Sequence, residues 1–513
     1  MRIRIAAIIA IFMVLCWVYG VLLLGSYQGY YCEEKYVVNA DIPISISVIR
    51  PKEIRSDTPI LLVHGYSGNR KTMKPLAITL ASIGFVCVTI DLRGHGSSGG
   101  SMIVTDPLRV GFFEADILST LRYLGSMGLN NESVIMVGHS MGGSIVSYLG
   151  IKYDFVLGVV SIAASIGRFA DIAPRNFSVD NPRNVLFVLA GHDNFVNRSS
   201  VYEAFYRSLG FVGSENRYYH VDGGLKALFV DYGANHINVI YSEKTHRYVS
   251  EFISKLVYGD AVRPEVCGSA LKDIAKISGL MGFLGVLLII GTIHVGRIDV
   301  VLMSMSKGPR RNMLIYIVFG FVIYILSASL LLITTHLGIA SLTTGSMVGF
   351  AFSVFLAFKP KITFSSVQRR AHILMDFAFG ILLWLGTVFV LEVTIGTYVM
   401  EILEIILARI IFLPIYLVCC AMYFLAFKML RNRYSSAKSI VITLLIFVSY
   451  IALLSFTLSI LGALILTIIL VNLSIQIPAL IILNRKQSIA VTTALSLLYA
   501  SMQIIFTPII SFA

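Results

Sequence analysis

The sequence has little charge for its length. Only 13% of its 513 residues are charged, whereas 57% are hydrophobic and the mean hydropathy is +0.82. Soluble proteins carry about 25% charged residues, so the low charge excludes a chain that is soluble throughout. Residues 27–276 hold 23 of the 28 acidic and 24 of the 41 basic residues. Almost all of the net charge of +13 therefore belongs to the hydrophobic remainder, which argues against nucleic-acid binding by the folded part.

Basic residues are also absent from every second connection between the long apolar runs. Residues 5–25 are long enough to cross a bilayer as a helix, and eight more runs follow residue 276. These eight lie near residues 277–295, 313–334, 338–357, 372–394, 402–427, 439–457, 459–483 and 489–511. Sixteen of the 17 basic residues outside 27–276 fall on the side of the N-terminus. The positive-inside rule then predicts a multi-pass plasma-membrane protein with a cytoplasmic N-terminus, and with residues 27–276 and the C-terminus outside.

The first apolar run favours an uncleaved anchor over a signal peptide. It is longer than the roughly 7–15 apolar residues of a signal peptide, and no A-x-A-like cleavage site follows it. The sequence thus predicts a transmembrane signal anchor in residues 1–26 and an extracytoplasmic domain in 27–276. An all-α domain of eight transmembrane helices is expected in 277–513. This organisation implies the lipid bilayer as a partner.

Cysteine is scarce, with six in the chain. No grouping of His, Cys and carboxylate residues has the spacing of a metal-ligand set, so neither a metal nor a cofactor is expected. Cys32 follows the first span and Cys267 precedes the second, and an exported domain folds in an oxidising compartment. A Cys32–Cys267 disulfide across the two ends of the domain is one expectation. Two unpaired thiols that flank the membrane are the alternative.

The segment between the first two spans has the pattern of an α/β domain. Short runs of β-branched apolar residues occur between helical patterns, which is typical of a mostly parallel sheet with helices on both faces. The strands are expected near residues 44–49, 59–63, 86–91, 133–137, 156–161, 185–190 and 226–231. The helices are expected near residues 72–83, 109–126, 140–151, 199–209 and 240–257.

The most informative motif is Gly-x-Ser-x-Gly at residues 138–142, which joins a predicted strand to a predicted helix. A nucleophilic serine in this setting lies on a sharp, strained turn that exposes its hydroxyl at the end of the sheet. Gly138 and Gly142 leave room for the strand and the helix to close around Ser140. His139 is expected to pack nearby or to line the pocket wall.

Polar residues also follow three other predicted strands. The first is followed by His64-Gly65-Tyr66, whose backbone amides can point at a developing oxyanion. The other two are followed by Asp193 and His236, so Ser140, Asp193 and His236 occur in a chain order known for Ser-Asp-His triads. The competitors are Asp222 and Asp231 for the acid, and His192, His220 and His246 for the base.

Residues 91–98 read Asp-Leu-Arg-Gly-His-Gly-Ser-Ser. With the motifs above, they make residues 45–260 resemble the α/β-hydrolase superfamily, in particular its esterase, monoacylglycerol-lipase-like and aminopeptidase-like branches. Many members carry a lid after the strand that here ends near Ser161. Only about 24 residues separate that strand from the next one, so the mouth of the site is expected to be open or covered by another part of the chain.

The resemblance implies a role for each motif residue. Ser140 would be the nucleophile, His236 the general base, and Asp193 the residue that orients the imidazole. The backbone amides of Met141 and Tyr66 would bind the oxyanion. No family resemblance extends to the membrane part.

These observations together predict a membrane-anchored serine hydrolase that cleaves a carboxylic ester. A lipid or acyl substrate is favoured only by the expected place of the site beside the bilayer. A serine peptidase and an acyltransferase use the same three side chains, so both stay open. A function of another class is a transporter or receptor formed by the membrane helices, with the outer domain as a binding module. The sequence identifies no protein partner.

Overall fold

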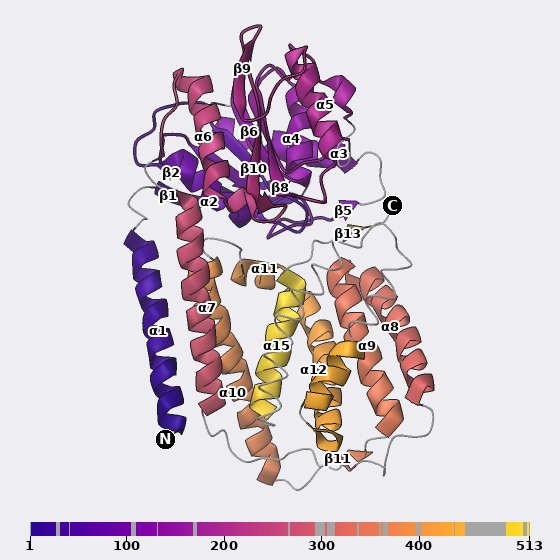
Figure 1. The fold of residues 1–513 in the computed structure, drawn as a ribbon. Coiled ribbons are helices and arrows are strands. Elements are labelled where there is room, and N and C mark those ends of the chain that lie inside the picture. The colour runs from indigo at the N-terminus through magenta and orange to yellow at the C-terminus, as the bar shows by residue number, and fades with distance from the viewer. Residues whose placement is uncertain are drawn as a thin grey trace. The chain divides into compact units, whose positions relative to one another are not determined.

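The computed structural model describes residues 2–26, 31–39, 42–103, 109–130, 132–167, 172–264, 267–292, 303–304, 313–335, 338–358, 361–362, 368–396, 402–435, 437–446, 489–505 and 510–511 (Figure 1). The chain divides into two compact units. Unit 1 consists of Met1–Cys16, Leu280–Leu391 and Ile402–Ile509, and unit 2 consists of Trp17–Gly279, Glu392–Glu401 and Ile510–Ala513. The division falls inside helices α1 (Arg2–Ser26) and α7 (Gly268–Thr292), which are each continuous across it.

Unit 2 is built on a nine-stranded sheet with the order β1-β2-β4-β3-β6-β7-β8-β10-β9. The six strands from β4 to β10 in this order are parallel, and β1, β2 and β9 pair antiparallel at the edges. The strands are β1 (Tyr31–Asn39), β2 (Pro43–Pro51), β3 (Ile60–Val63), β4 (Cys87–Ile90), β6 (Val134–His139), β7 (Val156–Ile162), β8 (Val185–His192), β9 (Arg217–Val221) and β10 (Gly224–Asn235).

All seven predicted strands are present, and the sequence patterns missed β1 and β9. Every residue of β3 and of β4 is buried, as expected for strands covered on both faces. The edge strands instead mix charged and aromatic residues, a pattern that gives no apolar run to detect. A further pair of short strands, β5 (Met102–Ile103) and β13 (Ile510–Ser511), forms a separate parallel ladder.

Five helices lie between or after the strands of the sheet, each within three residues of its predicted bounds. They are α2 (Arg70–Ala81), α3 (Arg109–Ser126), α4 (Met141–Lys152), α5 (Arg198–Leu209) and α6 (Glu243–Tyr258). Helices α2 and α6 lie on one side of the sheet, and α3, α4 and α5 lie on the other (Figure 1). The fold is therefore an α/β sandwich of three layers, and the carboxyl ends of its parallel strands share one edge.

Buried charges attach the edge strand β1 to helix α2. The carboxylate of Glu33 lies 2.5 Å from Nζ of Lys71 and 2.5 Å from Nζ of Lys74. Burial alone raises the pKa of Glu33, but the charges and hydrogen bonds of the two lysines outweigh it and lower the pKa to about 2. Glu33 is thus ionised at neutral pH and holds β1, the strand that follows α1, against the domain.

The predicted Cys32–Cys267 disulfide is absent from the structure, where both residues are free thiols. Neighbouring side chains of a strand point to opposite faces, and Glu33 points toward α2, so Cys32 points away from α2 and is exposed. Cys267 lies on the α2 side, since the amide of the next residue, Gly268, donates to Oγ1 of Thr79 over 2.8 Å. The expectation of two unpaired thiols fits this arrangement.

Three of the described helical segments are long and apolar enough to cross a membrane, namely Ile8–Ser26, Phe377–Thr394 and Ile410–Phe427. Shorter apolar helices cover Tyr316–Leu331, Thr344–Phe358 and Ala437–Ile446. The predicted span 459–483 lies outside the described residues, as do most of the basic connections between the spans.

Unit 1 is helical, and its core is apolar. Its main helices are α8 (Met313–Thr335), α9 (Gly338–Phe358), α10 (Gln368–Leu391), α11 (Leu403–Ala408), α12 (Leu413–Arg433) and α15 (Ile489–Ile505). A Cβ on Gly345 would lie 2.7 Å from the Cβ of Ala328, so small residues let α8 and α9 approach closely. Polar groups pair between helices, as where Nε1 of Trp384 donates to Oγ of Ser501 over 3.0 Å.

Candidate active site

Ser140 lies on a strained turn between the end of β6 and the start of α4. Its φ of +53° and ψ of −116° are rarely adopted by residues with a side chain, and they match the geometry expected of a nucleophile at the end of a sheet. A Cβ on Gly142 would overlap the carbonyl oxygens of Val63 and His64, and a Cβ on Gly138 would overlap the backbone of Gly142. The close approach of β3, β6 and α4 therefore requires both glycines of the motif.

Three side chains from different strand ends form one hydrogen-bonded chain. Nε2 of His236 lies 2.9 Å from Oγ of Ser140, and Nδ1 lies 2.7 Å from Oδ2 of Asp193. An ionised carboxylate only accepts, so we assign the ring proton to Nδ1, which leaves Nε2 to accept from the serine hydroxyl. This arrangement allows the proton of Ser140 to move to His236 while Asp193 stabilises the resulting imidazolium.

Asp193 is ionised although it is buried. Its side chain is 1% exposed, whereas that of His236 is 18% exposed. Burial alone raises the pKa of Asp193, but the hydrogen bond and charge of His236 and the amides of Phe195 and Val196 outweigh it, so the pKa lies below its usual value. Asp193 therefore holds the orientation of His236, whose ring remains open to a substrate.

The competing acids and bases are engaged elsewhere or exposed. Asp231 accepts a hydrogen bond from the hydroxyl of Ser242. His246 is buried, with Nδ1 2.8 Å from Oγ1 of Thr79. The remaining competitors, Asp222, His192 and His220, are exposed.

Two backbone amides are available beside Ser140. Met141 begins α4, so its amide has no partner within the helix. Among the described residues, neither its amide nor that of Tyr66 donates to a backbone carbonyl, whereas the amide of Ser140 donates to Ile162 over 2.8 Å. A Cβ on Gly65 would lie 3.0 Å from the Cβ of Ser140, which places the segment of Tyr66 next to the serine. The amides of Met141 and Tyr66 can thus bind a developing oxyanion.

Comparison with known proteins identifies the fold of this segment. Residues 58–229 match the family described as the alpha/beta hydrolase fold. This part of the chain belongs to the α/β-hydrolase superfamily. Unit 2, which contains it, is called the hydrolase domain from here on. Ser140 and Asp193 lie within the matched residues, and His236 follows them.

The hydrolase domain is similar in sequence to two lipases. A thermostable monoacylglycerol lipase of Bacillus sp. (strain H-257) is 30% identical over 107 residues, which are 21% of this chain and 40% of the lipase. A (lyso)-N-acylphosphatidylethanolamine lipase of Bos taurus is 33% identical over 101 residues, which are 20% of this chain and 28% of that lipase. The chain thus matches less than half the length of these curated relatives.

The chain is also similar to solved structures. The Pyrococcus furiosus esterase Pf2001 aligns with a TM-score of 0.35 and 16% identity, over 45% of this chain and 94% of the esterase.

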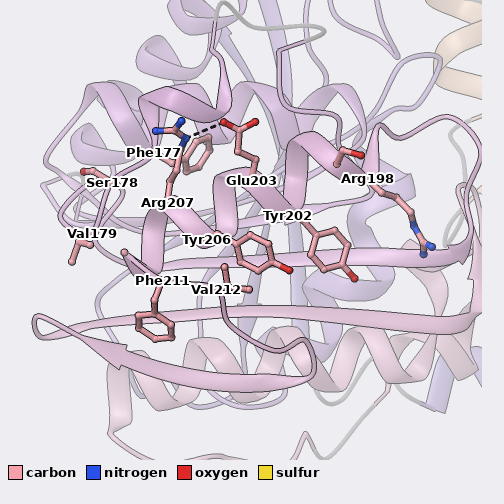
Figure 2. Close-up of a pocket in the computed structure, with 12 residues that line it drawn as sticks. Phe177, Ser178, Val179, Arg198, Tyr202, Glu203, Tyr206, Arg207, Phe211 and Val212 are labelled. Carbon is pink, nitrogen blue, oxygen red and sulfur yellow. Dashed lines mark hydrogen bonds and ion pairs between the residues drawn. The ribbon is translucent and has the colours of Figure 1, made fainter.

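A groove on the hydrolase domain lies along α5 and does not include the three hydrogen-bonded side chains. It has a volume of about 1100 Å³ and is lined by α5 with residues 177–179 and 210–212. Figure 2 shows Tyr202 and Tyr206 projecting from α5 along the groove, which also contains the Glu203–Arg207 ion pair at 3.0 Å.

Residues 177–179 belong to the connection between β7 and β8. The only helix described in that connection is a 3₁₀ turn at residues 174–176, so its described part contains no lid helix.

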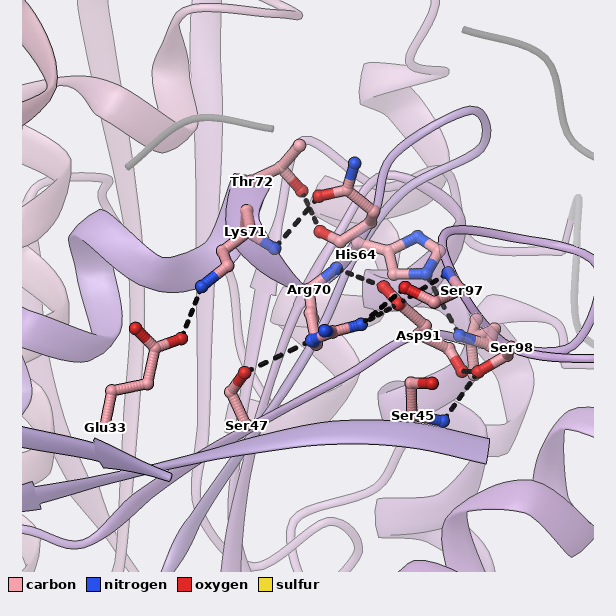
Figure 3. A network of polar contacts seen from close by, with 12 residues as sticks. Glu33, Ser45, Ser47, His64, Arg70, Lys71, Thr72, Asp91, Ser97 and Ser98 are labelled. Carbon is pink, nitrogen blue, oxygen red and sulfur yellow. Dashed lines mark hydrogen bonds and ion pairs between the residues drawn. The ribbon is translucent and has the colours of Figure 1, made fainter. Parts of the chain in front are cut away.

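A polar network holds residues 64–70, the segment that carries the Tyr66 amide, against residues 91–98 (Figure 3). Nε2 of His64 accepts the amide proton of Leu92 over 3.1 Å, so its Nδ1–H donates to the carbonyl of Gly65 over 2.7 Å. At the other end of the segment, Asp91 accepts the amide of Arg70 over 2.5 Å and forms a buried ion pair with its guanidinium. Because a peptide is planar, fixing the Gly65 carbonyl also fixes the direction of the following amide, that of Tyr66.

Two features that position His236 were not predicted from the sequence. The ring of Phe195 lies 5.0 Å from the ring of His236, and nothing in the sequence pointed to this contact. Asn235 and Asn238 close the turn that carries His236, with Oδ1 of Asn238 2.6 Å from the amide of Asn235. Asparagines on both sides of a histidine are a turn signal that could have been read.

No group of three or more His, Cys, Asp or Glu side chains in the described part of the chain is arranged to hold a metal ion. The chemistry that the described groups of the hydrolase domain can perform is proton transfer, nucleophilic attack and oxyanion binding.

Proposed function

We propose that this chain is a membrane-tethered serine hydrolase that cleaves a carboxylic ester through an acyl-enzyme on Ser140. The observation that carries the proposal is the hydrogen-bonded chain from Asp193 through His236 to Ser140. The strained turn at Ser140, at the carboxyl ends of the parallel strands, supports it further.

In the proposed reaction, Oγ of Ser140 bonds to the carbonyl carbon of the ester while Nε2 of His236 takes the hydroxyl proton. The amides of Met141 and Tyr66 stabilise the negative charge on the carbonyl oxygen. His236 then gives its proton to the leaving alcohol as the ester C–O bond breaks. Water attacks the acyl-serine with His236 again as the base, which releases the acid and restores the serine.

The proposed substrate is an ester of a lipid. Two of the similar proteins are named as lipases, one of monoacylglycerol and one of an acylated phosphatidylethanolamine. The end of β10 and the turn that carries His236 also expose apolar surface, since Tyr232 is 59% and Ile237 is 55% exposed. Such a surface beside the site favours contact with an acyl chain. A peptidase or an acyltransferase would use the same three side chains, so only substrates distinguish these activities.

Labelling with a fluorophosphonate probe tests the proposed nucleophile. Membranes that contain the wild-type chain are expected to label, and those with Ser140→Ala are not, because the probe bonds only to an activated serine. Ser119→Ala is the matched control, since this serine lies on α3 and its Oγ accepts from Arg122. Hydrolysis of monoacylglycerol, short acyl esters and peptide amides, with and without an added alcohol acceptor, then assigns the reaction.

Two outcomes would contradict the proposal. Equal labelling of wild type and Ser140→Ala would place the nucleophile elsewhere. Absence of labelling in a folded wild-type chain would remove the hydrolase function and make the membrane helices, as a transporter or receptor, the leading candidate.

We also propose the membrane arrangement, in which residues 1–26 anchor the chain, the N-terminus is cytoplasmic, the hydrolase domain is outside and residues 277–513 cross the plasma membrane eight times. The placement of basic residues supports it, as do the three apolar helices. A further support is the ladder of β13 with β5, in which Ile510 pairs with Met102. A C-terminus paired with the hydrolase domain requires an even number of crossings between them.

Epitope tags test this arrangement. A tag after the C-terminus and a tag in the exposed turn at Asp222 are expected to bind antibody on intact cells, because both lie outside. A tag at the N-terminus is expected to bind only after the membrane is opened. A C-terminal tag that needs opened membranes would overturn the even number of crossings.

A further inference from the structure

The residue directly before the nucleophile, His139, contacts the turn that carries the general base. Its ring lies 5.4 Å from the ring of His236, at an interplanar angle of 44°. Its Nε2 lies 2.9 Å from the backbone carbonyl oxygen of His236. A carbonyl only accepts, so Nε2 carries the hydrogen and donates. This bond joins the end of β6 to a turn that is 97 residues away in the sequence.

The same ring also borders the segment that carries the Tyr66 amide. A Cβ on Gly65 would lie 3.1 Å from Nδ1 of His139 and 3.0 Å from the Cβ of Ser140. His139 therefore lies between Gly65 and His236 and is covalently joined to Ser140. His139 thus contacts His236 and the segment at Gly65 through its ring, and it is joined to Ser140 through its peptide bond.

His139 acts here as a neutral donor. Burial lowers its pKa to about 4, and the neighbouring ring of His236 lowers it as well. A neutral imidazole has one N–H group, and that of His139 donates its hydrogen bond to the carbonyl oxygen of His236. Because the ring is uncharged, it adds no repulsion when His236 becomes an imidazolium.

The turn around His236 is closed by its own hydrogen bonds. Oδ1 of Asn235 accepts the amides of Ile237 and Asn238, each over 3.0 Å. A turn that is closed in this way moves as a unit, so its attachment to neighbouring elements decides where the imidazole lies. The bond from His139 is an attachment to β6, the strand that leads to Ser140.

We propose that His139 is a positioning residue for the reaction proposed above, on which this inference rests. By holding the carbonyl of His236, its Nε2–H sets the distance between Nε2 of His236 and Oγ of Ser140. His139 itself does not touch the reacting atoms.

Two substitutions in the full-length chain separate the hydrogen bond from packing. His139→Phe keeps a ring and removes the donor, whereas His139→Gln keeps an N–H group close to the position of Nε2. We expect His139→Phe to lower both the rate of fluorophosphonate labelling and kcat on a p-nitrophenyl ester by roughly 10- to 100-fold, because a small displacement of a catalytic group has effects of this size. KM should change little, and His139→Gln should recover most of the rate.

Melting temperatures of both variants serve as the control for folding. Labelling of His139→Phe at the wild-type rate, with an unchanged melting temperature, would overturn the inference while the hydrolase function stands. Equal losses in the Phe and Gln variants would overturn it as well, because they would show that packing and not the donor matters. If the wild-type chain itself fails to label, the proposed function fails, and the inference fails with it.

Discussion

Ser140→Ala and His236→Ala are each expected to lower kcat for ester hydrolysis by about 10⁵- to 10⁶-fold, and the double variant by no more than either single change. In the proposed mechanism the two side chains act in one step, since the hydroxyl attacks only as the imidazole removes its proton. Once one of them is gone, the other contributes nothing further. The residual rate above that of water would come from the amides of Met141 and Tyr66 and from substrate binding.

Asp193→Asn provides the matching test of the acid. An amide cannot stabilise the imidazolium or hold the Nδ1–H tautomer, so kcat is expected to fall by about 10⁴-fold. Asp231→Asn is the control, because Asp231 lies at the end of the neighbouring predicted strand but bonds to Ser242. Steady-state rates of the purified full-length variants measure both effects. An equal loss in the two variants would show that Asp193 is not the acid of the triad.

Asp91→Ala is expected to destabilise the hydrolase domain by about 3–5 kcal/mol, which lowers the melting temperature by about 10 °C. The side chain of Asp91 is 0% exposed and that of Arg70 is 2% exposed. Removal of the carboxylate leaves a buried guanidinium without its counter-charge and the amide of Arg70 without its acceptor. Differential scanning fluorimetry of the solubilised chain measures the shift.

Two controls make this expectation specific to buried charge. Arg70→Met combined with Asp91→Leu removes both charges and should cost less stability than Asp91→Ala alone. Glu53→Ala breaks an exposed pair with Arg55, whose side chains are 81% and 50% exposed, and should change stability by less than about 1 kcal/mol. An unchanged melting temperature of Asp91→Ala would mean that solvent reaches the Arg70 guanidinium.

Asp91→Ala should also affect catalysis in the molecules that remain folded. The network of Asp91 and Arg70 fixes one end of the segment that carries Tyr66, and His64 fixes the other. Loss of one attachment lets the oxyanion amide move, so kcat is expected to fall more than KM rises. This would link residues 91–98, whose role the sequence did not indicate, to the geometry of the site.

Local sequence patterns were sufficient to predict most strands and helices of the hydrolase domain. Strands such as β3 and β8 are continuous apolar runs, and their burial on both faces is a property of each run by itself. The turn at Ser140 was equally readable, because its Gly-x-Ser-x-Gly motif is a local pattern, although the need for Gly142 comes from the carbonyl oxygens of Val63 and His64 on a distant segment. The lack of charge similarly identified apolar helices from composition alone, and three described segments have the length and hydropathy to cross a membrane.

Contacts between distant parts of the chain were decided only by the tertiary structure. The sequence left both Asp193 and Asp231 open as the acid, and the choice depends on which carboxylate the fold brings to His236. The same holds for Cys32, whose direction is set by the register of β1 on β2, and for the bond from His139 to a carbonyl 97 residues away. Hydrophobic periodicity and short motifs are properties of a few neighbouring residues, whereas hydrogen-bond partners are chosen when the strands assemble into one sheet.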